Sequence, residues 1–589
     1  MFYDENGKDP IRVPFPENAG LGRMYSVNIT GIPNDHDRYR LFFGNSEEVD
    51  RCARRIYGLE SMTAPDDRKK LLGRVMPDAS SDPGICSQYD RNEGKLRREN
   101  DLIYLLHVRG FTKSPSAGIT KKQRGTFAGV TEKLGHIASL GANIIELMPA
   151  YEISSLMPQR EEAPDEPEER INYWGYTTGY YFAPRSVYAC SDPCSEFRNM
   201  ADAIHERHMA LVMQFWFSKE TPAIFISAVL RHWVRVYGVD GFHLIGGDLA
   251  FETLSADPAL AGKLMYYESI DENRIVISPE DEIRTSVSVY RDDFQNTVRH
   301  FLKGDNDTTV RFFGEMIKRG EKCGHVNYIA GYSGFRLADF VAYEHKHNEA
   351  NRENNADGPD DNASWNCGAE GKTRRIAVLK LRRKLVLNAL LMLFFSQGTP
   401  MIFAGDEFLN SQEGNNNPYC QDNAVSWINW NLENTKTGQD VSAFIRFLSS
   451  YRKAHGILGG AVPLKLMDYK AFGYPDLSAH GTDAWQPDFS AFSHSVGMLY
   501  CNLYAKEQDP AFIYCIYNCH WEDKRFALPS MPGNLSWKVI VDTSRYENEC
   551  EVRKITGKEK SVLVKARSCM VIETSGRIKI TEKKGRTPF

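Results

Sequence analysis

The sequence predicts an α/β fold, a (β/α)8 TIM barrel flanked by two β-domains. Short apolar segments such as ALVMQFW and VDGFHLI alternate with segments of helical periodicity over about 350 residues, which is longer than an open sheet usually needs. After Gly459 the helical pattern stops, and SVGMLYCNLY and AFIYCIYNC are typical of antiparallel strands. We therefore expect a barrel over 100–458 and a C-terminal β-domain over 459–589.

The predicted strands and helices can be placed in order along the chain. Residues 1–99 alternate apolar and polar positions around turn signals, which predicts a partial N-terminal β-sandwich and a linker. NDLIYLLHVRGF and GANIIELMP enclose the helical segment FAGVTEKLGHIASLG, which predicts a βαβ unit. Further strands are expected at RIVISP, VNYIAGY and PMIFAGDE, and a buried helix at LVLNALLMLFF.

Composition narrows the function classes. The 589 residues hold 72 Lys and Arg against 77 Asp and Glu, a net charge of -5, which argues against a nucleic-acid partner. The longest apolar run, Leu385 to Phe395, is interrupted by Asn388 and is shorter than the ~20 residues that span a bilayer, so no membrane partner is expected. MFYDENGKDP lacks the features of a secretory signal, so we expect a cytoplasmic protein.

The 12 cysteines form neither a dense disulfide framework nor a C-x-x-C pair. The spacings of Cys190/Cys194 and Cys515/Cys519 occur in some metal sites, but no nearby His or Cys completes four ligands. Reduced, buried thiols are the expectation, with no metal and no cofactor.

Longer phrases carry a family resemblance. INYWGYTTGYYFAPRSVYA (Ile171–Ala189), GVDGF (Gly238–Phe242), KHNEANRENNADG (Lys346–Gly358) and the stretch from Ser396 to Trp430 closely resemble the α-amylase superfamily, glycoside hydrolase family 13, in its isoamylase and glycogen-debranching branch. The resemblance implies a barrel that hydrolyses α-1,6 branch linkages in glycogen or starch-like glucans, using three carboxylates at strand ends. A retaining glycosidase needs one carboxylate as nucleophile and another as proton donor.

These carboxylates are absent from the expected positions. By resemblance, Ile245 replaces the nucleophilic Asp of the fourth strand and His243 replaces its Arg. In RIVISPED, taken as the fifth strand, Ser278 replaces the general acid. In VNYIAGYSGFRL, Tyr332 replaces the sugar-binding His and Ser333 the third acid.

The third-strand phrase is also altered. Gln214, Ser218 and Lys219 stand where relatives have Asp, Asn and His, and the short connection that follows predicts loss of the small domain that often helps hold calcium in amylases. The residues expected to carry the chemistry are replaced at the ends of all four of these strands, while the sequence segments between them still resemble the family. We therefore expect a cavity with little fixed negative charge.

Two displaced acids remain as alternatives for catalysis. Asp248 lies three residues beyond Ile245 and Glu280 two beyond Ser278; the competing interpretation makes Asp248 a helix N-cap and Glu280 a solvated loop residue.

Candidate glucan contacts are the aromatic residues Trp174, Tyr176, Trp216 and Tyr332, for which packing is the alternative role. Asp406, which follows the eighth strand, is a further candidate, with anchoring of the next loop as its alternative role.

Three functions remain open. The first is a non-catalytic glucan-binding or regulatory protein, by analogy a partner of an active debranching enzyme or of another glycogen-metabolism protein. The second is an active α-1,6-glucan hydrolase that uses Asp248 and Glu280, and the third is a protein-interaction scaffold that no longer binds glucan. Because MFYDENGKDPIRVPFP resembles the interior of the family's N-terminal sandwich, we also expect that sandwich to be incomplete, with an exposed edge.

Overall fold

The computed structural model describes residues 1–575 except 5–9, 17–19, 22–23, 26, 28, 65–69, 76–100, 158–169, 247–248, 250, 277–283, 461–462, 506–508, 532–534, 546–552 and 556–558. No helix in these described ranges is both long enough and apolar enough to cross a bilayer.

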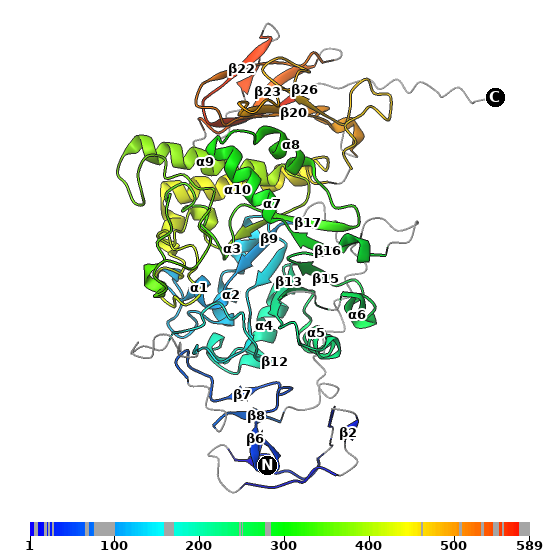
Figure 1. The fold of residues 1–589 in the computed structure, drawn as a ribbon, viewed down its shortest axis with the longest axis vertical. Helices are drawn as coiled ribbons and strands as arrows, with labels where there is room; N and C mark the ends of the chain where they lie inside the picture. Colours follow the sequence, from blue (N-terminus) through cyan, green and yellow to red (C-terminus); the bar gives the residue numbers. More distant parts are fainter. Residues whose placement is uncertain are drawn as a thin grey trace, which may run out of the picture.

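A closed barrel of eight parallel strands forms the centre of the molecule (Figure 1), which confirms the predicted fold class. Its interior is filled by alternate side chains of the strands, including Ile103, Val212 and Met401. In spatial order the strands are β9 (Ile103–Leu106), β10 (Ile144–Leu147), β13 (Ala210–Trp216), β14 (Gly241–Ile245), β15 (Leu264–Tyr267), β16 (Arg284–Tyr290), β17 (Cys323–Tyr328) and β18 (Thr399–Phe403).

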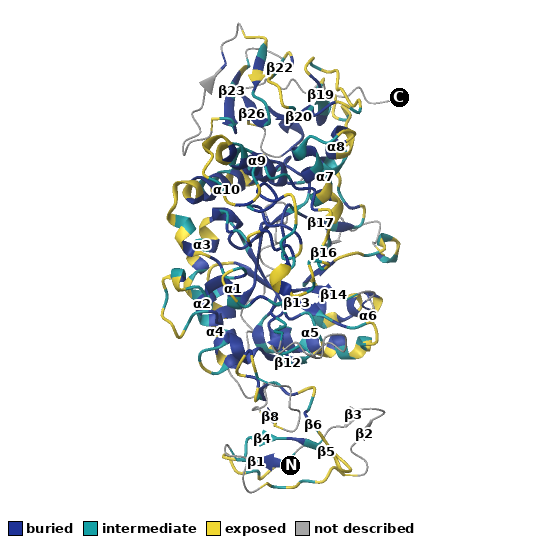
Figure 2. Cartoon of the chain, turned by 60° about the vertical axis from the view of Figure 1, so that its left-hand side comes forward, coloured by how far each residue is buried: buried dark blue, intermediate teal, exposed yellow. Residues whose placement is uncertain are grey.

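Helices surround the barrel, with their buried faces toward the strands (Figure 2). The predicted apolar helix is confirmed as part of α9, where Asn388 is fully buried. The Asn388 amide donates to the Arg567 carbonyl at 3.0 Å and accepts from the Thr543 hydroxyl at 2.6 Å, so it joins the barrel to the C-terminal sheet. The helices are α1 (Val108–Thr112), α2 (Phe127–Glu132), α3 (Leu134–Ser139), α4 (Pro193–His205), α5 (Ala223–Tyr237), α6 (Phe251–Ser255), α7 (Asp292–Lys303), α8 (Thr309–Ile317), α9 (Ile376–Phe394) and α10 (Lys436–Ala454).

Antiparallel sheets lie at the two ends of the molecule (Figure 1). The C-terminal sheet has the order β19 (Leu477–His480), β20 (Ser495–Cys501), β21 (Phe512–Asn518), β26 (Ser568–Ser575), β23 (Ser536–Asp542), β24 (Arg553–Lys554), and β22 (Lys524–Ala527) pairs with β25 (Ser561–Val564). The N-terminal sheet has the order β1 (Phe2–Tyr3), β4 (Arg38–Tyr39), β8 (Leu72–Arg74), β7 (Ile56–Tyr57), beside the pairs β2 (Gly20–Leu21) with β3 (Met24–Tyr25) and β5 (Leu41–Phe43) with β6 (Ser46–Glu48). That this N-terminal part is a truncated sandwich stays a prediction, as do the three domain boundaries.

The fifth barrel strand differs from the sequence prediction. RIVISP was expected there, but Ile275 ends the short 3-10 helix Glu272–Arg274, and Val276 is 79% exposed and outside any strand. The fifth strand is instead β15, which pairs with β14 and β16. Since β15 has only four residues and no α-helix is described between it and β16, the alternation of strand and helix gives no signal at this point.

The connection after the third strand is short, as predicted. Only residues 217–222 separate the end of β13 from the start of α5, which leaves no room for an inserted domain.

A buried carboxyl group next to the N-terminal sheet makes stability depend on pH. Glu152 in β11 (Tyr151–Glu152), the partner strand of β12 (Tyr180–Pro184), is fully buried, and burial raises its pKa from 4.5 to about 7. Because the folded state then binds the proton more tightly than the unfolded chain, this group lowers stability as pH rises from about 4.5 to about 7. Between pH 5 and pH 8 we expect wild-type protein to lose on the order of 1–3 kcal/mol relative to Glu152→Gln in urea unfolding. Parallel pH profiles for the two proteins would contradict this.

Candidate functional site

A cavity of about 690 Å³ opens at the carboxyl ends of the barrel strands. Its wall combines aromatic rings with carboxyl groups, so it offers both stacking surfaces and hydrogen-bond acceptors. The rings are those of Trp174, Tyr290, Tyr328 and Tyr332, and the acids are Glu268, Asp292, Asp293 and Asp361.

This wall corrects the expectation of little negative charge. Against the four acids the cavity lining has one guanidinium, that of Arg299, and the side chain of His243. Arg299 is buried and donates to the backbone carbonyls of Ile329 and Phe335, so its hydrogen bonds serve the fold. The cavity therefore attracts hydrogen-bond donors and positive charge.

The fourth strand places His243 and Ile245 on the same face, two residues apart. His243 lines the cavity, and its Nδ1 lies 2.7 Å from Glu146 Oε1. Ile245 is 7% exposed and ends β14. An apolar side chain at this point can neither attack an anomeric carbon nor offer it negative charge.

Glu268 is the residue that sequence reasoning missed. It directly follows β15, the true fifth strand, and it lines the cavity. Partial burial raises the pKa of Glu268, His243 opposes this shift, and Asp292 reinforces it. A carboxyl group with a raised pKa can donate a proton, so an acid is present at the end of the fifth strand after all. The signal was the polar pair Glu268–Ser269 after the apolar run LMYY.

Three of the predicted site residues lie outside the described residues. They are Ser278 and Glu280, which belong to the connection between β15 and β16, and Asp248, which follows β14. The fifth strand is β15, which ends at Tyr267, so the prediction that RIVISPED forms this strand is wrong. The role of Ser278 itself stays a prediction.

The seventh strand leads into Tyr332 and Ser333, and both line the cavity. The ring of Tyr332 lies 5.3 Å from that of Trp174, edge to face, and 5.1 Å from that of Tyr176. Tyr176 is behind this wall, where its hydroxyl donates to Gln214 Oε1. Thus Trp174 and Tyr332 face the cavity, while Tyr176 and Gln214 support them.

The remaining candidates are not part of the cavity lining. Trp216 ends β13, and its carbonyl accepts from the Tyr181 hydroxyl at 3.0 Å. Asp406 is buried in the 3-10 helix Asp406–Phe408 and accepts from Arg336 Nε at 3.1 Å, which fits the anchoring role. Burial raises the pKa of Asp406 to about 6. Ser218 and Lys219 lie in the loop after β13.

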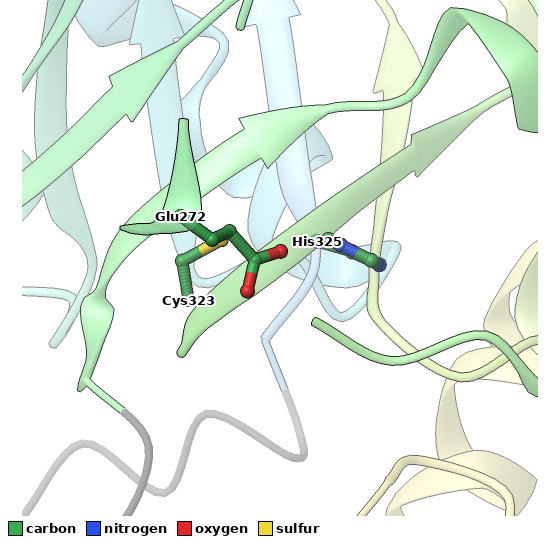
Figure 3. A group of neighbouring side chains, drawn as sticks. All are labelled: Glu272, Cys323 and His325. Carbon is green, nitrogen blue, oxygen red and sulfur yellow. The ribbon is translucent and has the colours of Figure 1, made fainter. Parts of the chain in front are cut away.

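One group of metal-ligating side chains occurs in the described part of the chain: Glu272, Cys323 and His325 (Figure 3), whose ligand atoms all lie within 4.8 Å of one another. Arg291 Nη1 donates to His325 Nδ1 at 2.8 Å. Since a guanidinium can only donate, the proton of a neutral His325 is on Nε2, and the ring has no lone pair left for a metal. The hydrogen bond between Arg291 and His325 therefore argues against a metal site at Glu272, Cys323 and His325.

The described cysteines form no disulfides. Ten are free and seven of these are buried, including Cys194 and both members of the Cys515/Cys519 pair, whereas Cys190 is half-buried.

The chain is a (β/α)8-barrel protein with a cavity at the carboxyl ends of its strands, and comparison with known proteins assigns its family. No protein-family model matches the chain. It is 30% identical over 517 residues to the glycogen debranching enzyme of Dickeya chrysanthemi, covering 74% of this chain and 76% of that enzyme. It is 29% identical over 545 residues to isoamylase 1 of Arabidopsis thaliana, covering 77% of this chain and 67% of the plant protein. For two cereal isoamylases the coverage of their length is 65% and 64%.

Solved structures share the fold at lower identity. The catalytic module of the glycogen-degrading pneumococcal virulence factor SpuA superposes with a TM-score of 0.65 at 18% identity, covering 94% of this chain and 89% of that one. The GBS pullulanase SAP, solved with maltotetraose, gives a TM-score of 0.66 at 17% identity, covering 92% and 79%. The chain belongs to the α-amylase superfamily, glycoside hydrolase family 13, in its isoamylase and glycogen-debranching branch.

Proposed function

We propose that this protein binds α-glucan without carrying out the retaining hydrolysis of its family, and that it serves as a partner of an active debranching enzyme. The observation that carries the proposal is Ile245 at the end of β14, where the covalent step needs a carboxylate. A second acid is absent at Ser333, which follows the seventh strand and lines the cavity; Ile245 itself is not among the lining residues.

The cavity and the relatives support a glucan ligand. Trp174 and Tyr332 provide ring faces for stacking on a sugar, and Glu268 and Asp292 provide acceptors for its hydroxyl groups. Relatives are named for glycogen debranching, and one structural neighbour was solved with maltotetraose.

Electrophoresis in gels that contain glycogen or amylopectin tests glucan binding. We expect polysaccharide to retard the wild-type protein, and Trp174→Ala to weaken binding about tenfold through loss of stacking. Trp216→Ala is the matched control, because Trp216 does not line the cavity. Absence of retardation by every α-glucan would instead favour a protein-interaction scaffold.

Hydrolysis by other acids is the second candidate, and Glu268 is the observation in its favour. This acid directly follows the fifth strand, and burial raises its pKa. Sustained release of reducing ends that Glu268→Gln abolishes would replace the first proposal with this one. The hydrolase proposal also rests on Asp248 and Glu280, so Asp248→Asn and Glu280→Gln are tested in the same assay.

A further inference from the structure

A fully buried carboxylate lies inside the barrel below the cavity. Glu146 in β10 has no exposed surface, and three neighbours from three other strands donate to it. Gln214 Nε2 and His243 Nδ1 each lie 2.7 Å from Glu146 Oε1, and the Tyr290 hydroxyl donates to Oε2. Glu146 therefore has enough partners within the protein and needs none from a ligand.

This network fixes the ring of His243. Its plane stacks on Tyr290, with centroids 4.4 Å apart and 14° between the planes, and the ring of Tyr266 meets it edge-on at 6.4 Å. The contact with Glu146 Oε1 at 2.7 Å occupies Nδ1. Nε2 is then the ring nitrogen that remains for a ligand.

The Nε2 atom is the unusual part of the arrangement. His243 is 2% exposed and lines the cavity, yet its Nε2 has no hydrogen-bond partner among the described residues. A buried polar atom without a partner costs free energy that a ligand can recover. The charged groups that face the ring are Glu146 below it and Glu268, whose pKa responds to His243, at the fifth strand.

We propose that His243 Nε2 forms a hydrogen bond with a hydroxyl group of a bound glucose unit, and that Glu146 is the positioning residue that fixes the His243 ring for this contact. This inference rests on the proposed glucan binding. The carboxyl groups of Glu268 and Asp292 in the same cavity wall can accept further hydrogen bonds, so the site suits a neutral, hydroxyl-rich sugar. A phosphorylated sugar would bring negative charge against these carboxylates and is disfavoured.

Calorimetric titration with maltotetraose tests the inference. His243→Asn places an amide near the former Nδ1, which keeps a donor for Glu146 but removes Nε2; we expect affinity to fall about five- to tenfold. His205→Asn is the matched control, because His205 is also buried and lies 2.9 Å from a carboxylate, Asp240, but does not line the cavity. Its affinity should equal that of the wild type.

Nitrogen NMR of the wild-type protein gives a second reading that does not depend on the variant folding. We expect the Nε2 resonance of His243 to move when maltotetraose binds. If wild type binds maltotetraose but His243→Asn binds equally well, or Nε2 does not respond, this inference is overturned and glucan binding stands. If wild type binds no glucan, the proposed function itself fails.

Discussion

Incubated with amylopectin, the wild-type protein should release reducing ends about 10⁵- to 10⁶-fold more slowly than an active isoamylase. Loss of a catalytic nucleophile costs a factor of this size in enzymes whose catalytic groups act together. At the end of β14 that group is absent, because the side chain is Ile245. Reducing-end assays over hours, with an active isoamylase at equal concentration as the reference, measure the difference.

Restoring single acids should not restore activity. Ile245→Asp and Ser333→Asp each return one carboxylate, and the double variant would join both to the native Glu268. We expect even the double variant to recover little, because His243 and Tyr332 still occupy the cavity where the resemblance implies Arg and His. Misplacement of a reacting group by 1 Å costs about 10²-fold. Robust debranching by the double variant would mean that only the acids had been lost.

The sequence predicted the barrel well because its strongest signals are local. ALVMQFW is β13 residue for residue, and the predicted helix LVLNALLMLFF lies within α9 except for its last residue. The fifth strand was not predictable in this way: LMYY is short, lacks a following α-helix in the described residues, and precedes the more strand-like RIVISP. Glu268 was lost from the candidate list as a direct result of that register error.

Parts of the site could not be predicted because they depend on contacts between distant strands. Nothing in the pattern of β10 marks Glu146 as the acceptor for groups 68, 97 and 144 residues away. The same applies to Trp216 and Asp406, which lie near strand ends in the sequence but do not line the cavity. Closure of the barrel selects which strand-end residues face one another, and a one-residue register difference changes that selection.

Glu146→Ala should destabilise the protein by about 3–5 kcal/mol, the cost of removing one partner from a buried charged network. The substitution leaves Gln214 Nε2, His243 Nδ1 and the Tyr290 hydroxyl without their acceptor in the barrel interior. Glu146→Gln is the matched control: its amide oxygen can still accept from Gln214 and His243, and its amino group can donate to the Tyr290 oxygen, so we expect a loss of only about 1 kcal/mol. Urea unfolding followed by near-ultraviolet circular dichroism measures both. If the two variants lose the same free energy of unfolding, charge and not the hydrogen-bond arrangement holds these strands together. Glu146 would then not fix the orientation of His243.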